Sequence, residues 1–323
     1  MRGQPGSAVS VGAPSGRPPT IRIRSIDMTT TALPNVRVEP YLVAADTHVI
    51  PQLVPAPPIG LVYINSLVIT GSEPILVDTG APSNREQWLA DAWNIVDPAD
   101  VRWVFLTHDD HDHAGNLRQV MDACPNATLV TTWFSMARYG IDCEDFWMPF
   151  DRVRWIRDGE SFSAGDRTLA AVRPPFFDNP TTRGLFDAST RTYWGVDSFG
   201  ANVPHPVEDA VDMDHEAWRD GVLLVNRLNH PWHLWLDEGK FGDYLRHVQS
   251  LGIEVLPSCH GPTIYGPMVD EAFQLLSQVP SMPQWEEPGQ ADLEAMLAAA
   301  GAMATAPVDT APLPAQPSPT QAS

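Results

Sequence analysis

Six titratable side chains, three histidines and three aspartates, follow one another without interruption in this chain. In order they are His108, Asp109, Asp110, His111, Asp112 and His113. Two carboxylates about 4 Å apart repel each other by about 4 kcal/mol at an effective dielectric constant of about 20, and a dication between them turns that repulsion into attraction. Imidazole and carboxylate together suit zinc, iron or manganese. The run therefore predicts a metal site.

The elements on either side of this run favour a metal site over the alternative, which is a solvated acidic loop. The apolar stretch VRWVFLT (101–107) predicts a strand, and AGNLRQVMDAC (114–124) predicts a helix. The run thus lies at the carboxyl end of a strand, where α/β sheets bind ligands. A tight loop there can direct His108 and Asp110 to one point, and Asp112 and His113 to a second.

Strand and helix patterns alternate through the rest of the chain. Residues 60–70, 73–80 and 127–132 predict strands, and 85–96 predict a helix. In the second half we expect strands within 153–175, a strand that ends at Asp197, helices between about 205 and 252, and a last strand that ends at His260. Two similar halves of this kind predict an α/β protein, with two sheets packed face to face and helices outside.

Composition predicts one folded domain between two unstructured ends. We expect a disordered N-terminal segment at 1–34, a metal-binding domain at 35–286 and a low-complexity tail at 287–323. Pro, Ala, Ser, Thr and Gly dominate both ends, which therefore cannot bury much surface. Hydrophobic residues make up 43% of the whole chain, enough for a sizeable core.

Charge and cysteine content restrict the partners and the compartment. The chain has 40 acidic and 20 basic residues, and its formal charge of −20 argues against binding to nucleic acid or to an anionic membrane. It lacks an apolar run of the roughly 20 residues that a membrane helix needs. The cysteines, Cys124, Cys143 and Cys259, are odd in number and widely spaced, which favours a reducing compartment over a disulfide framework. We therefore expect a soluble cytoplasmic protein.

Four motifs together resemble the metallo-β-lactamase superfamily. THDDHDHAGN (107–116) is similar to its H-x-H-x-D-H motif, with Asp110 at the position of the second histidine. ILVDTG (75–80), DGESFSAGDRTL (158–169) and LPSCHGP (256–262) occur in the superfamily's order. The resemblance covers about residues 40–285 and implies an αββα sandwich of two mixed sheets, with a metal site at their edge. A carboxylate at Asp110 is typical of the flavodiiron proteins and related oxygen-binding diiron domains, which have glutamate there.

The same resemblance nominates the remaining metal ligands. GVDSFGA (195–201) resembles the segment whose aspartate bridges two irons, and SCHG (258–261) resembles the segment of the final histidine ligand. The family has one more histidine, but FFDNPTTRG (176–184) stands in its place, so Asp178 takes that role. The implied set is His108, Asp110 and Asp178 for metal 1, Asp112, His113 and His260 for metal 2, and Asp197 as the bridge.

A charge count favours iron over zinc in this set. Four carboxylates balance two dications, whereas the usual dizinc hydrolases have more histidines and a net positive site that acidifies bound water. A neutralised, oxygen-rich site suits the harder ions iron and manganese and stabilises a higher oxidation state. We therefore expect two metal ions, with iron favoured and zinc or manganese as alternatives.

Three functions remain open at this point. The first is a non-haem diiron protein that binds or reduces O2 or a similar small oxidant. Because no flavodoxin-like domain follows in the sequence, its electrons would come from a separate donor protein, or the protein would sense the oxidant rather than turn it over. The second is a hydrolase of esters, thioesters, lactones or phosphodiesters that uses a metal-bridging hydroxide. The third is a non-catalytic binding protein. A homodimer is implied by the family resemblance alone.

Several residues near the motifs have alternative interpretations. Asp78, at the end of a strand, can orient a ligand histidine or cap a loop. Asp109 and His111 alternate with the ligands and so are expected to point away from them, with a ligand role as the alternative for His111. Cys259 is interpreted as a packed residue. His230 and His233, among tryptophans, are interpreted as surface or core histidines, with a place in the lining of an entrance as the alternative.

Overall fold

The computed structural model describes residues 36–142, 148 and 150–305. The expected N-terminal segment (1–34), residues 306–323 of the expected C-terminal tail, and Cys143 lie outside these ranges. The described residues from 36 to 287 form one compact unit. Helix α8 (Gln290–Thr305) belongs to a separate unit. In the described part of the chain, none of the helices has the length and apolar character needed to cross a membrane.

The first sheet is mixed, with its strands in sequence order. Its long antiparallel hairpin consists of β2 and β3, while β4, β5, β6 and β7 run parallel. Parallel strands need covering helices on the crossovers, and α1 (Arg85–Ile95), α3 (Leu117–Ala123) and α4 (Trp133–Asp142) provide them. The strands are β1 (Tyr41–Ala44), β2 (Thr47–Ala56), β3 (Gly60–Ile69), β4 (Ile75–Val77), β5 (Trp103–Phe105), β6 (Thr128–Thr131) and β7 (Val153–Trp155).

The second sheet has the order β13-β12-β11-β10-β9-β8 and is antiparallel except for the β11–β12 pair. Its strands are β8 (Ser161–Ala164), β9 (Arg167–Val172), β10 (Gly184–Asp187), β11 (Thr192–Trp194), β12 (Val255–Leu256) and β13 (Ile264–Tyr265). The helices are α1 (Arg85–Ile95), α2 (His111–Ala114), α3 (Leu117–Ala123), α4 (Trp133–Asp142), α5 (His215–Asn229), α6 (Glu238–Gln249) and α7 (Pro267–Gln278).

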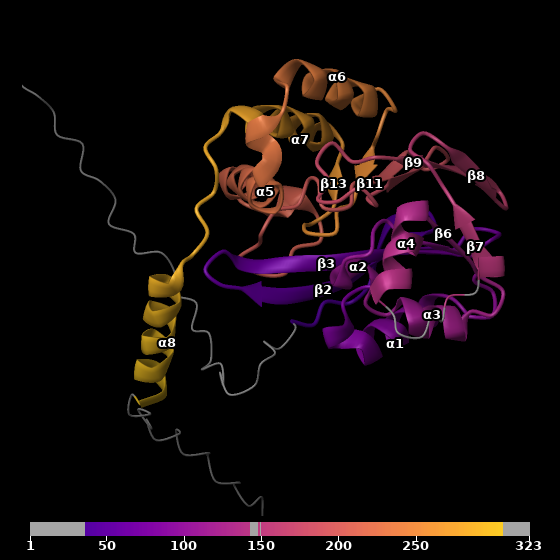
Figure 1. Cartoon of the computed structure of the whole chain (residues 1–323), viewed down its shortest axis with the longest axis horizontal. Helices are drawn as coiled ribbons and strands as arrows, with labels where there is room; N and C mark the ends of the chain where they lie inside the picture. Colours follow the sequence, from indigo (N-terminus) through magenta and orange to yellow (C-terminus); the bar gives the residue numbers. More distant parts are fainter. Residues whose placement is uncertain (1–35, 143–147, 149, 306–323) are drawn as a thin grey trace, which may run out of the picture. The chain divides into compact units, whose positions relative to one another are not determined.

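Three apolar clusters show how the layers pack. One joins the inner faces of the two sheets, for example Phe105 with Trp194. A second cluster packs Trp88 of α1 and several side chains of α3 against the first sheet. A third cluster packs α5, α6 and α7 against the second sheet. Figure 1 shows α5, α6 and α7 on one side of the sheets and α1 and α3 on the other. The predicted αββα sandwich of mixed sheets is confirmed.

The structure corrects three strand and helix boundaries. The strand predicted to end at Asp197 ends at Trp194, and a tight turn follows in which Val196 and Phe199 have positive φ values of 56° and 67°. The strand predicted to end at His260 is only Val255–Leu256, and β13 follows it. The helix predicted over 114–124 is divided at 115–116, and β1 and β2 were not predicted. In each case tertiary contacts override the local pattern.

Candidate metal centre

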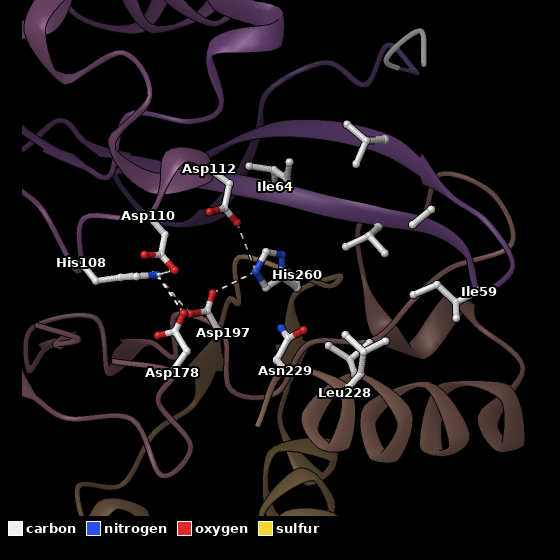
Figure 2. Close-up of a pocket in the computed structure, with 14 residues that line it drawn as sticks. Ile59, Ile64, His108, Asp110, Asp112, Asp178, Asp197, Leu228, Asn229 and His260 are labelled. Atoms are coloured by element: carbon white, nitrogen blue, oxygen red, sulfur yellow. Dashed lines mark ion pairs between the residues drawn. The ribbon is translucent and has the colours of Figure 1, made fainter. Parts of the chain in front are cut away.

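All seven predicted ligands lie just beyond the carboxyl ends of strands. His108 and Asp110 follow β5, and Asp112 and His113 lie on the short helix α2 that starts there. The other three come from later loops: Asp178 after β9, Asp197 after β11 and His260 after β12. These ends meet at one edge of the sandwich, so residues up to 152 positions apart converge there (Figure 2).

The first group of donors is His108, Asp110 and Asp178. The Nε2 atom of His108 lies 3.6 Å from Oδ2 of Asp110 and 3.5 Å from Oδ2 of Asp178. His108 is buried, whereas the two carboxylates are 40% and 27% exposed and so border a cavity. These three side chains are the predicted ligands of metal 1.

The second group is Asp112, His113 and His260. Oδ2 of Asp112 lies 3.6 Å from Nε2 of His113 and 3.5 Å from Nε2 of His260. The sulfur of Cys259, buried in the core, is within 4.8 Å of the donor atoms of this group. These three residues are the predicted ligands of metal 2, and Cys259, which we interpreted only as a packed residue, borders them.

Asp197 lies between the two groups, and its two oxygens face different groups. Oδ1 is 3.0 Å from Nε2 of His113 and 2.9 Å from Nε2 of His260, while Oδ2 is 3.4 Å from Nε2 of His108. The side chain is only 4% exposed, and Oδ2 has no hydrogen-bond partner among the described residues. A buried carboxylate oxygen without a partner is costly unless a cation compensates it.

The spacing of the donor atoms fits metal coordination. Two ligands bound to one ion at about 2.1 Å lie about 3.0 to 3.5 Å from each other in octahedral or tetrahedral geometry. The N–O separations within the two groups and to Asp197 range from 2.9 to 3.6 Å. The residues therefore fit a pair of metal ions that share one carboxylate.

The pKa shifts in the metal-free protein also fit a site for a pair of metal ions. Burial alone would lower the pKa of His108, but Asp197, Asp110 and Asp178 outweigh burial and raise it to about 10. Burial alone would raise the pKa of Asp197, but the neighbouring His113 and His108 hold it well below its usual range. In the absence of metal, protonated imidazoles thus balance the negative charge of the carboxylates. Metal cations bound between the same side chains would balance that charge instead.

Each of the three predicted ligand histidines is oriented through its other ring nitrogen. Nδ1 of His113 donates to Oδ2 of Asp78 at 2.9 Å, and Nδ1 of His260 donates to the carbonyl oxygen of Tyr63 at 2.8 Å. Nδ1 of His108 lies 3.1 Å from the hydroxyl of Thr107. These contacts leave all three Nε2 atoms facing the centre, the arrangement that typically supports a metal-bound imidazole.

Asp78 has both of the roles suggested by the sequence, orienting a histidine and capping a loop. It orients His113, and it also caps the loop, because its Oδ1 accepts hydrogen bonds from the backbone N–H of Thr107 at 2.9 Å and from the Thr107 hydroxyl at 2.8 Å. Trp194 donates to its Oδ2 from Nε1 at 3.1 Å. The VDTG motif brings this buried carboxylate to the strand end, but only the packed structure shows its partners.

The remaining residues of interest lie outside the two groups. Asp109 pairs with Arg138 at 2.9 Å and accepts from the Thr181 hydroxyl at 3.0 Å, so it holds the ligand loop against its neighbours. His111 is exposed. His230 and His233 are both fully buried, which excludes the surface interpretation.

Comparisons with known proteins agree with this geometry. Residues 59–175 match the model of the metallo-beta-lactamase superfamily. The chain is 28% identical to putative diflavin flavoprotein A 1 of Thermosynechococcus vestitus over 153 residues. These aligned residues make up 47% of this chain and 26% of that protein. The chain therefore spans about a quarter of that relative's length.

Two solved structures are similar in fold. Rubredoxin oxygen:oxidoreductase from Desulfovibrio gigas superimposes with a TM-score of 0.64 at 16% identity, over 75% of this chain and 62% of that one. The flavodiiron protein from Giardia intestinalis gives a TM-score of 0.63 at 17% identity, over 76% of this chain and 60% of that one. The folded unit therefore has the metallo-β-lactamase fold, and the predicted resemblance to the flavodiiron branch of that superfamily is confirmed.

Proposed function

We propose that this chain holds a non-haem diiron centre that binds or reduces O2 or a similar small oxidant. One observation carries the proposal: the buried Asp197 directs one oxygen toward His108 and the other toward His113 and His260. A carboxylate in that position suits two ions rather than one. Two irons bound there would supply redox electrons and open coordination positions for the oxidant.

The protein's own residues would hold and tune this pair. His108, Asp110 and Asp178 would bind one ion, and Asp112, His113 and His260 the other. The hydrogen bonds that His113 and His260 donate from Nδ1, to Asp78 and to the Tyr63 carbonyl oxygen, keep these two histidines in the tautomer that presents Nε2. Four carboxylates against two dications leave a neutral, oxygen-rich site, which favours iron or manganese over zinc. The hydrolase alternative is less favoured, because the similar structures are an oxidoreductase and a flavodiiron protein.

The proposal includes a separate electron donor. Reduction of O2 to two waters consumes four electrons and four protons, and the structurally similar rubredoxin oxygen:oxidoreductase is named for a protein donor. The formal charge of −20 favours a donor with a basic face and argues against nucleic acid and anionic membranes as partners. A cytoplasmic location and a homodimer complete the proposal. The free thiols of Cys124 and Cys259 are consistent with a reducing compartment.

Metal analysis of protein purified under low oxygen tests this function. We expect two irons per chain, an oxo-bridge absorption band after oxidation, and O2 uptake with an artificial reductant. Asp197→Ala should abolish the band and the uptake, while Asp187→Ala, which removes a buried carboxylate paired with Arg167, should retain both. Two zincs per chain together with esterase activity would overturn the proposal.

A further inference from the structure

A cavity of about 420 Å³ opens directly onto the candidate metal centre. The ligand side chains form one end, and an apolar wall continues away from them between the β2–β3 hairpin and α5 (Figure 2). The main apolar side chains of that wall are Val54, Ile59, Val62, Ile64, Val225 and Leu228. The cavity is therefore divided into a charged end and an apolar end.

The size of this cavity exceeds what a diatomic oxidant needs. A molecule of about the size of water occupies roughly 30 Å³, so the cavity is more than ten times larger. Its volume lies instead at the lower end of the range of small-molecule sites, about 300 to 1,000 Å³. The space suits an organic molecule.

Most of the apolar wall lies outside the core clusters of the described residues, although Ile64 packs against one of them and Val225 is buried. Val54, Ile59, Val62 and Leu228 are each half-buried, and among the described residues none of them joins the three core clusters. The hairpin tip is nevertheless held in place, because Asn202 donates to the Ile59 carbonyl from Nδ2 at 2.6 Å. Apolar side chains held at a cavity surface without core partners are typical of ligand sites.

The polar groups restrict the ligand further. None of the described residues that line the cavity is lysine or arginine, so a charged group on the ligand far from the centre would have no counter-ion. Among the described lining residues, the one uncharged polar side chain is Asn229, at the end of α5, whose carboxamide lies toward His260 in Figure 2. An amide in that position can pair with an oxygen atom of the ligand.

We propose that the cavity binds an uncharged organic molecule, with one oxygen-donor group at the metal centre and an apolar body between the β2–β3 hairpin and α5. The inference about the oxygen-donor end rests on the proposed function, whereas the inference about the apolar body rests on the cavity alone. Such a molecule would be a substrate or effector that shares the site with the small oxidant.

A homologous series of n-alkyl hydroxamic acids, from acetyl to octanoyl, tests the apolar end on iron-loaded protein. The hydroxamate head binds iron, and each added methylene should tighten the dissociation constant about fourfold, up to about six carbons. Leu228→Gln should flatten this dependence. Leu42→Gln, at a 55% exposed position of β1, is the matched control and should leave it unchanged.

The outcomes separate the two proposals. If acetohydroxamate binds but longer chains bind no better, the organic-ligand site is wrong while the metal centre stands. If the protein takes up no metal, the proposed function fails. The cavity is then tested by titrating n-alkanols into the metal-free protein. Affinity that rises with chain length would support the organic-ligand site, and affinity independent of chain length would overturn it. An octanoyl analogue with a carboxylate at the far end should bind at least about tenfold more weakly than octanohydroxamate, and equal binding would refute the requirement for an uncharged body.

Discussion

Asp78→Asn is the substitution whose effect follows most directly from the structure. The fully buried Asp78 carboxylate accepts from the backbone N–H and hydroxyl of Thr107 through Oδ1, and from Nδ1 of His113 and Nε1 of Trp194 through Oδ2. Asparagine has the same shape, but one of its two terminal atoms is a donor. Whichever way the amide turns, an N–H group meets either the Thr107 N–H or the His113 and Trp194 N–H groups.

The substitution should affect both the free energy of unfolding and the affinity for metal. A buried donor left without an acceptor costs about 1 to 3 kcal/mol, so the metal-free protein should lose about that much free energy of unfolding. Loss of the carboxylate also removes the group that holds His113 with Nε2 toward the centre, and such orienting partners are worth about 10- to 100-fold in metal affinity. We therefore expect weaker binding of the second metal in addition to lower stability.

Urea unfolding of the metal-free protein and competitive titration with cobalt against a chelator measure the two effects separately. Asp187→Asn is the matched control, because Asp187 is also a buried carboxylate, bonded to Arg167 at 2.7 Å, and it belongs to neither donor group. It should lose stability but keep its metal affinity. If Asp78→Asn is destabilised yet binds cobalt as tightly as the wild type, the orienting role is refuted. If the control loses affinity equally, the effect on binding is general.

Three further outcomes are expected. Asp197→Asn should lower metal affinity at both positions by at least about tenfold, because each of its oxygens faces a different group; isothermal titration showing one unaffected site would contradict a shared ligand. Asp178→His should retain two metals per chain, while Asp178→Ala should weaken the position shared with His108, as measured by metal content after dialysis against a chelator; full retention in the alanine variant would remove Asp178 from the ligand set. Burial raises the pKa of the Cys124 thiol to about 12, so its peptide should remain unlabelled after iodoacetamide treatment of the native protein at about pH 8, and rapid labelling would argue against its burial.

The candidate metal site could be proposed from local features of the sequence. The spacing of His108, Asp110, Asp112 and His113, after an apolar strand and before a helix, depends only on neighbouring residues, and the structure has that strand and a helix that begins at His111. The layered α/β architecture could also be predicted, because apolar periodicity is a local property that recurs in both halves of the chain.

Local patterns were less informative about where elements end. The run around Asp197 continues as an apolar strand by composition, yet the strand ends at Trp194. The Ser258 hydroxyl donates to the carbonyl oxygens of Val196 and Ser198, at 3.0 and 2.9 Å, and holds the turn that follows. That contact joins residues about 60 positions apart, so no local window contains it.

The sequence by itself determined which donor atoms are available and how four of them are spaced along one loop. Tertiary structure alone decided that the two oxygens of Asp197 face different groups, that Asp78 both caps the loop and orients His113, and that the hairpin and α5 enclose an apolar cavity beside the centre. The physical reason is that these features depend on how two sheets pack against each other. Packing brings together side chains from segments far apart in the chain, and it sets their orientation through contacts that the order of residues does not contain.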